Sequence, residues 1–312
     1  MENHEETIQI SSFRDRKTGL VIFGIFQIII GSLLALSSLM FIFSTTLLAF
    51  YKTSSTSANT GNFAHFSLFV AVPAVWFIWM GIGSVKARRW ARALLLVSSW
   101  FGFIIGISTF IVYIYNQIAK SGQIFEYKFL TWIIIVLIIV PGTLILFYGS
   151  KNVKATCEFR NPQISWTDKC PLPVLAVSFI YLYMAGSMLS GGSNAWVIPF
   201  FGYILNGVAG AGISIVGFFL YCYMIWGAYK LNIKAWWCAV LVTIASTVSG
   251  VVTFLRVDSW NLYQKMIFPE QQLEHMRQTV SQSSTVLSYA LWGITVLGYL
   301  LYTRRYFVSP FK

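Results

Sequence analysis

Long stretches of this chain contain no Asp, Glu, Lys or Arg, and this feature limits the possible folds most strongly. They are 18–51, 53–85, 93–119, 129–150, 170–229, 235–255 and 278–303. Each is longer than the ~20 apolar residues that cross the hydrocarbon core of a bilayer. Charged residues make up 10% of the chain, compared with about 25% of a typical soluble domain. A soluble globular fold is therefore excluded, and we expect an all-α polytopic membrane protein.

Eight transmembrane helices are predicted from these windows. The window 170–229 is too long for one helix, and the polar, glycine-rich segment 191–194 divides it. The predicted spans are 20–43, 68–84, 90–115, 129–148, 172–189, 201–226, 236–254 and 286–302. They divide the chain into an N-terminal tail (1–19), a first four-helix unit (20–148), a linker (149–171), a second four-helix unit (172–302) and a C-terminal tail (303–312).

The distribution of basic residues predicts the orientation of these spans. Of the 22 Lys and Arg residues, 16 lie on the side that carries both termini and the linker, and 6 lie on the other side. Cytoplasmic loops carry such an excess, so both termini are expected in the cytoplasm. The net charge of +12 is thus predicted to face anionic lipid headgroups of the bilayer, and nucleic acid is not an expected partner.

The N-terminal apolar run indicates a retained first span, because it is longer than a signal-peptide core and no convincing cleavage site follows it. The chain contains no Asn-x-Ser/Thr sequon. This absence favours a prokaryotic plasma or inner membrane, that is, a cell membrane, over a glycosylating secretory route.

Two pairs of segments suggest an internal repeat. A shift of 146 residues superposes segment 81–96 on 227–242, with Gly81 on Gly227 and Trp90 on Trp236. A shift of 155 relates 31–34 to 186–189. We expect a 4+4 duplication whose halves keep the same orientation and are related by an axis along the membrane normal. Chance recurrence of glycine and tryptophan at membrane boundaries is the alternative.

Tryptophans next to basic residues mark the two matched turns. Trp90, Trp236 and Trp237 are predicted to be interfacial anchors at the level of the lipid headgroups, where Lys and Arg reach phosphates. A specific lipid site at these turns is the alternative.

The segment 147–175, with its mixed charges and closely spaced prolines, is the most distinctive part of the chain. It resembles the linker of uncharacterised multi-pass bacterial membrane proteins, a resemblance that implies no activity and no functional residues. Thr167 or Asp168 is expected to cap or lead into the fifth span, with Pro171 and Pro173 at its first turn. Trp166 and Asp168 are candidates for docking a partner protein, or for folding the linker back so that it locks the two halves together.

The ionisable residues argue against most membrane chemistries. All ten Asp and Glu residues fall outside the predicted spans, so no carboxylate is placed for a proton relay at the midplane. The three histidines are isolated and no H-E-x-x-H motif is present. Cys157 and Cys170 lack the partners of a zinc site, whereas Cys222 and Cys238 are expected to pack as small hydrophobic residues. No metal, cofactor or catalytic residue is therefore expected.

The sixth span is rich in glycine, including Gly207 and Gly210, and carries Asn206 directly before Gly207. Close helix packing explains this composition, and the alternative is a discontinuous helix that lines a polar cavity. A short amphipathic helix after Pro269 is expected to lie against the outer surface.

The sequence favours a non-enzymatic membrane protein with a structural or interaction role, because its few ionisable residues form no recognisable catalytic set. A small-solute or lipid-like permease is the alternative, and it requires a polar cavity between the halves near mid-membrane. A surface enzyme built on Glu158, Arg160 and Asp168 is a third possibility.

Overall fold

The computed structural model describes residues 14–51, 57–119, 127–189, 196–266, 273 and 281–308, with the side chains of 45, 48–51, 57–70 and 119 excepted. Apart from one short hairpin, the regular structure in these ranges is helical. The predicted amphipathic helix after Pro269 lies outside the described residues, Leu273 excepted.

The helices follow the predicted spans, with two short helices in the linker. They are α1 (Lys17–Tyr51), α2 (Ser57–Val85), α3 (Arg89–Ala119), α4 (Tyr127–Trp132), the π-helix η1 (Ile133–Ile139), α5 (Val140–Gly149), α6 (Lys151–Arg160), the 3₁₀-helix η2 (Trp166–Lys169), α7 (Leu172–Leu189), α8 (Gly207–Tyr229), α9 (Ile233–Arg256), α10 (Ser259–Lys265) and α12 (Gln282–Val308). Strands β1 (Ile198–Phe200) and β2 (Tyr203–Leu205) precede α8. Helices α4, η1 and α5 form one rod, Tyr127–Gly149.

Seven of these rods are long and apolar enough to cross a membrane. They support a multi-pass helical architecture. In α2, the apolar part for which side chains are described is Ala71–Val85, which is shorter than these seven rods. Large apolar side chains of α1 recur outward at helical spacing, as at Ile22, Phe26, Ile29 and Leu33. This outward hydrophobicity fits a lipid environment and would be unfavourable in water.

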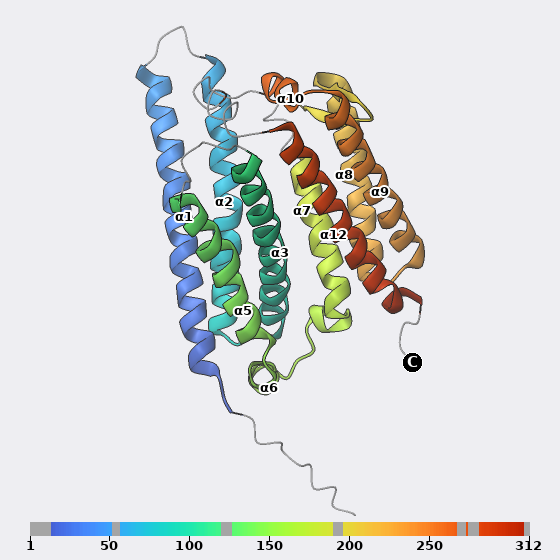
Figure 1. Ribbon diagram of the computed structural model, residues 1–312. Coiled ribbons are helices and arrows are strands. Elements are labelled where there is room, and N and C mark those ends of the chain that lie inside the picture. Colours follow the sequence, from blue (N-terminus) through green and yellow to red (C-terminus); the bar gives the residue numbers. More distant parts are fainter. Residues whose placement is uncertain are drawn as a thin grey trace, which may run out of the picture.

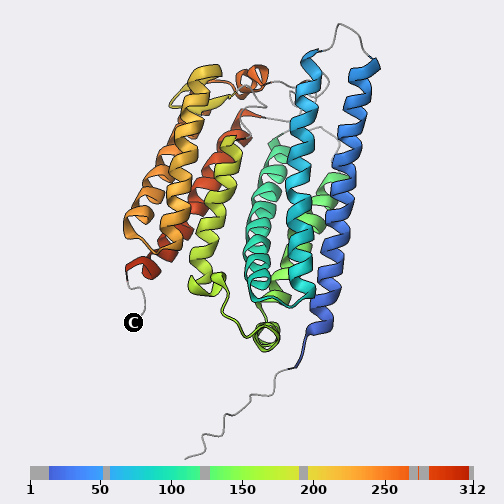
Figure 2. The ribbon, with the colours of Figure 1, turned by 180° about the vertical axis from the view of Figure 1, so that it is seen from behind.

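The rods form two neighbouring groups, one from α1 to α5 and one from α7 to α12 (Figures 1 and 2). Helix α1 begins and α12 ends at the end of the bundle where α6 lies (Figure 1). We call this the linker end, and the opposite end, which carries β1, β2 and α10, the hairpin end.

Glycines bring α1 and α2 into backbone contact. A Cβ atom added to Gly81 would lie 2.7 Å from the carbonyl oxygen of Gly24, and one added to Gly31 would lie 2.9 Å from that of Ala74. Both distances are shorter than a van der Waals contact, so only glycine fits. Helix α3 and the fourth rod are in backbone contact in the same way, because a Cβ on Gly106 of α3 would overlap the Leu137 carbonyl of η1. Small residues are what allow membrane helices to approach this closely.

The turns after α2 and α8 have the same hydrogen-bond pattern. The amide of Ala87 donates to the carbonyl of Ser84, and the amide of Arg88 to that of Gly83, at 2.9 Å each. In the second turn Leu231 donates to Ala228 and Asn232 to Gly227, again at 2.9 Å. These are Schellman motifs, with Ala87 and Leu231 at positive φ where glycine is usual.

The two turns correct the register of the expected repeat. Gly83, and not Gly81, occupies the position of Gly227, so the shift here is 144 residues instead of 146. A Cβ on Gly83 would strike Ala91, just as one on Gly227 would strike Ala235. Trp236 therefore corresponds in position to Arg92 and not to Trp90.

The start of the predicted sixth span is wrong, because α8 begins at Gly207 and not at residue 201. The preceding residues form the antiparallel pair β1–β2, which turns at Phe201 and Gly202, both at positive φ. Hydroxyl groups of α9 hold this turn: Ser249 accepts from the Phe201 amide and Thr253 from the Gly202 amide, both at 2.9 Å.

Candidate functional site

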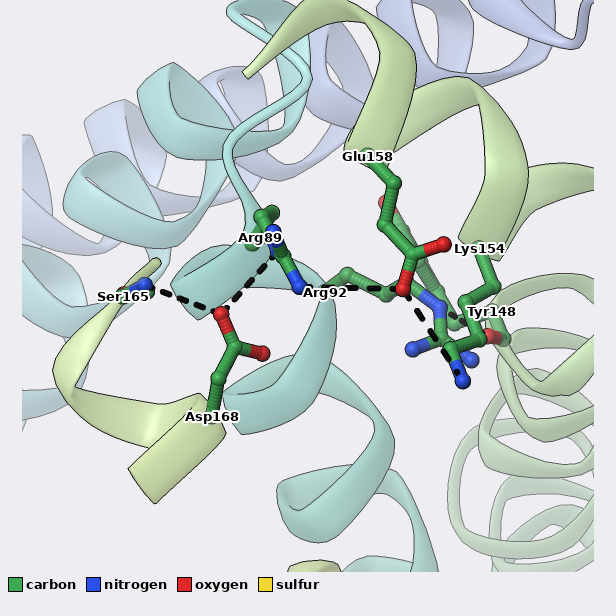
Figure 3. A network of polar contacts seen from close by, with 7 residues as sticks. All are labelled: Arg89, Arg92, Tyr148, Lys154, Glu158, Ser165 and Asp168. Atoms are coloured by element: carbon green, nitrogen blue, oxygen red, sulfur yellow. Dashed lines mark hydrogen bonds and ion pairs between the residues drawn. The ribbon is translucent and has the colours of Figure 1, made fainter. Parts of the chain in front are cut away.

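A network of ion pairs lies where the linker meets the start of α3 (Figure 3). The Nε atom of Arg89, the first residue of α3, lies 3.0 Å from Oδ2 of Asp168. Its Nη2 atom lies 3.7 Å from Oε1 of Glu158, which also pairs with Lys154 at 3.8 Å. Two linker carboxylates therefore face one arginine, at a helix N-terminus where negative charge is favourable.

Local structure within the linker places these carboxylates. Asp168 accepts the Ser165 amide at 2.9 Å and completes a capping box around η2. Ser150 caps α6, which carries Glu158. Asp168 thus caps η2, whereas α7 starts at Leu172 with Pro173 in its first turn.

The linker also contacts the second half of the bundle. The hydroxyl of Tyr229, the last residue of α8, donates to the backbone carbonyl of Trp166 at 3.1 Å. The two rings lie 6.5 Å apart between centroids. The linker therefore joins α3 to α8, and the sequence-based candidates Trp166 and Asp168 both take part. Their partners Arg89 and Tyr229 were missed, because neither differs in sequence from other boundary residues.

Buried polar contacts tie the helices together beside this network. Ser84 of α2 donates to the Leu20 carbonyl of α1 at 2.9 Å and lies 2.7 Å from the Tyr148 hydroxyl of α5. Nε of Arg92 donates to the Tyr148 carbonyl at 3.0 Å. All four rods of the first half therefore meet at the linker end.

The second half contains an equivalent contact. Nε1 of Trp236 donates to the Leu300 carbonyl of α12 at 2.9 Å. Trp236 is buried in the core, whereas Trp237 is half exposed. Trp90 stacks on Trp79 with centroids 4.7 Å apart. The three predicted anchors therefore occupy different environments, and Trp236 is a hydrogen-bond donor within the core.

The predicted cavity residues lie at the hairpin end. Asn206 and Gly207 are exposed, and α8 runs without a break from Gly207 to Tyr229. Gly210 is buried, and a Cβ there would overlap the carbonyl of Trp196. Gly210 therefore serves close packing.

Aromatic side chains fill the boundary between the halves. The ring of Phe101 on α3 lies 5.5 Å from Phe179, 5.2 Å from Tyr183 and 5.9 Å from Trp292. A cavity of about 30 Å³, beside Tyr181 and Thr243, lies within the second half. It has room for about two water molecules.

The two linker cysteines are buried, which disfavours their thiolate forms. Burial raises the pKa of the Cys157 thiol and of the Cys170 thiol to about 11 each. Within the described ranges, no three His, Cys, Asp or Glu side chains cluster closely enough to hold a metal ion.

No protein-family model, curated protein or solved structure matches this chain.

Proposed function

We propose that this chain is a non-enzymatic integral membrane protein of a cell membrane, in which a cytoplasmic linker holds two four-helix halves together as one structural unit. The aromatic boundary at Phe101 is the observation that carries this proposal. Side chains interlocked across that boundary favour a fixed arrangement. A permease that alternates between two states needs a hydrated path near mid-membrane.

The proposed topology has eight spans, with α2 as the second span and the linker end in the cytoplasm. The excess of basic residues supports this orientation. Cysteines introduced at Gln163 in the linker and at Gln282 at the start of α12 test it in intact cells, using a maleimide that does not cross membranes. Only Gln282→Cys should react from outside, and external labelling of Gln163→Cys would overturn the orientation.

The proposed architecture is a 4+4 duplication. The two Schellman turns support it, as do the matching bonds from Arg92 to the fourth rod and from Trp236 to α12. In each half the third helix donates a side-chain hydrogen bond to a carbonyl near the linker end of the fourth rod.

The third possibility, a surface enzyme, is less well supported. Glu158 and Asp168 face Arg89, and Arg160 pairs with Asp15. The Arg160 hydrogen bond holds the pKa of the Asp15 carboxyl below its usual range. These groups are therefore engaged in ion pairs, and a general base near neutral pH needs a raised carboxyl pKa.

We call the contacts of Asp168 with Arg89 and of Trp166 with Tyr229 the linker clamp. A double-mutant cycle with Arg89→Gln and Asp168→Asn tests it. Because both side chains are partly exposed, we expect a coupling free energy of about 0.5–1 kcal/mol in thermal unfolding. Asp258→Ala is a matched control, because Asp258 caps α10 but has no ion pair within the described ranges.

Protease sensitivity gives a second readout of the clamp. In inside-out vesicles, trypsin should cut the linker faster in Trp166→Ala and Asp168→Asn than in the unsubstituted protein or Asp258→Ala. Unchanged stability together with rapid cleavage of the unsubstituted linker would contradict the clamp. Unchanged stability with loss of a co-purifying protein would indicate docking instead.

A further inference from the structure

An open, basic pocket of about 410 Å³ lies at the linker end of the first half. Four cationic side chains line it together with Val85, Ala87 and Asn161: Lys17, Lys86, Arg88 and Arg160. They come from the start of α1, the turn between α2 and α3, and the end of α6. Three separate elements therefore bring like charges to one place, which costs free energy unless an anion offsets the repulsion.

Of the carboxylates that the structure describes, Asp15 stands beside this pocket and pairs with one of the four cations. Asp15 pairs with Arg160 and accepts the backbone amide of Lys17 at 2.9 Å. Among the described residues, Lys17, Lys86 and Arg88 have no carboxylate within ion-pair distance. Counting only the part of the chain that the structure describes, the pocket therefore has an excess of about three positive charges.

Hydrogen bonds fix the backbone that carries the two cations of the turn. Ala87 adopts φ 48° and is buried, so the Schellman motif turns the chain between Lys86 and Arg88. Both of these side chains are exposed. The turn thus places two charges on a rigid support, which lowers the entropy lost when a ligand binds.

The equivalent turn of the second half lacks this arrangement. Asn232 stands where the first half has Arg88, and its side chain caps α9 by accepting the Lys234 amide at 2.9 Å. The first helix of the first half, α1, begins with the cation Lys17. The first helix of the second half, α7, instead follows the uncharged Pro171. The second turn keeps Lys230 at the position of Lys86 but has no cation at that of Arg88, so the full charge of the pocket is not a consequence of the turn motif alone.

We propose that this pocket binds a phosphate group, either that of an anionic lipid or that of a free phosphorylated solute. Arg and Lys supply several charge-assisted donors to phosphate oxygens. Basic pockets between membrane helices at the cytoplasmic side are suited to anionic headgroups. The volume is sufficient for such a headgroup. The proposal is independent of the linker clamp, because neither Arg89 nor Asp168 lines the pocket.

Binding is measured on the purified full-length chain by native mass spectrometry and thermal shift. The probes are dioleoyl phosphatidic acid, dioleoyl phosphatidylglycerol, dioleoyl phosphatidylcholine and inorganic phosphate. The test variant is Lys86→Ala/Arg88→Ala, and the control is Lys230→Ala/Lys234→Ala, which removes two charges from the other turn. Lys17→Gln is a second test variant in case the turn variant folds poorly.

An anionic lipid should bind with a stoichiometry of one, and both test variants should weaken it, the double variant by about 10–30-fold. The control should bind as the unsubstituted protein does. Saturable stabilisation by inorganic phosphate, lost in the same variants, would assign a free phosphate in place of a lipid. Equal losses in test and control variants would overturn the proposal, as would equal binding of phosphatidylcholine or no binding of any probe.

Discussion

The close approach of α1 and α2 at Gly81 leads to a quantitative prediction for Gly81→Ala. The new methyl group would lie 2.7 Å from the Gly24 carbonyl oxygen and 3.0 Å from the backbone nitrogen of Ile28. These are backbone atoms, so no side-chain rotation relieves the overlap and the helices must separate. Overpacking of this kind costs about 1–3 kcal/mol.

Gly298→Ala on α12 is the matched control. A Cβ atom at Gly298 meets no heavy atom within 4 Å among the described residues. At Gly298 the substitution therefore changes only the helix propensity, which favours alanine over glycine by about 0.5–1 kcal/mol in water. The two variants make the same chemical change and differ in what the added methyl group contacts.

The assay is thermal unfolding of both variants in the same detergent, followed by the fluorescence of a thiol-reactive or tryptophan reporter. Gly81→Ala should unfold several degrees below the unsubstituted protein, and Gly298→Ala at or slightly above its temperature. A double variant with Gly24→Ala should cost less than the sum of the single variants, because one separation of the helices relieves both overlaps. Equal unfolding temperatures for Gly81→Ala and Gly298→Ala would refute the proposed backbone contact.

Three further predictions concern buried groups. Tyr148→Phe removes the hydroxyl that bonds to Ser84 and should lower stability by about 1 kcal/mol in thermal unfolding; an unchanged midpoint would contradict the bond. Cys157 and Cys170, with pKa values raised to about 11, should hold only about a thousandth of their thiols as thiolate at pH 8, compared with about a tenth at a pKa of 9. Mass spectrometry should therefore find them unmodified by iodoacetamide at pH 8, with reaction increasing as the pH approaches 11; rapid native labelling at pH 8 would show that they are accessible. Gln27 is buried on α1 without a hydrogen-bond partner among the described residues, so Gln27→Leu should raise stability by about 1 kcal/mol, and a loss would mean that its amide has a partner in the membrane.

The multi-pass helical fold was predictable because it depends on where charges are absent. Charged residues mark the two ends of each apolar window, and the thickness of the bilayer sets how long a window must be to span it. The hairpin before α8 was not predictable in this way. Its residues are as apolar as a span, and the turn at Gly202 depends on the Thr253 hydroxyl, which is 51 residues away.

The candidate site was predictable in part. The linker residues Trp166 and Asp168 stand out in sequence because a tryptophan and an acid lie beside prolines. The partner of Asp168 did not stand out, because Arg89 belongs to a run of basic residues that predicts the same orientation whether or not any of them makes a contact. The sequence singled out the two similar turns but aligned them by their tryptophans, at a shift of 146 residues. Their hydrogen bonds match at a shift of 144, where Gly83 packs against the Ala91 side chain as Gly227 packs against Ala235.

The central claim is that the two halves form one fixed unit, and distances between spin labels test it most directly. One pair joins Ile118→Cys to Tyr203→Cys at the hairpin end, and the other joins Leu146→Cys to Val308→Cys at the linker end; all four positions are exposed. Both pairs are made with Cys222 and Cys238 replaced by alanine, and are measured in liposomes. We predict a single distance population for each pair. Two populations, in which one end of the bundle widens as the other narrows, would contradict a fixed unit and favour the permease.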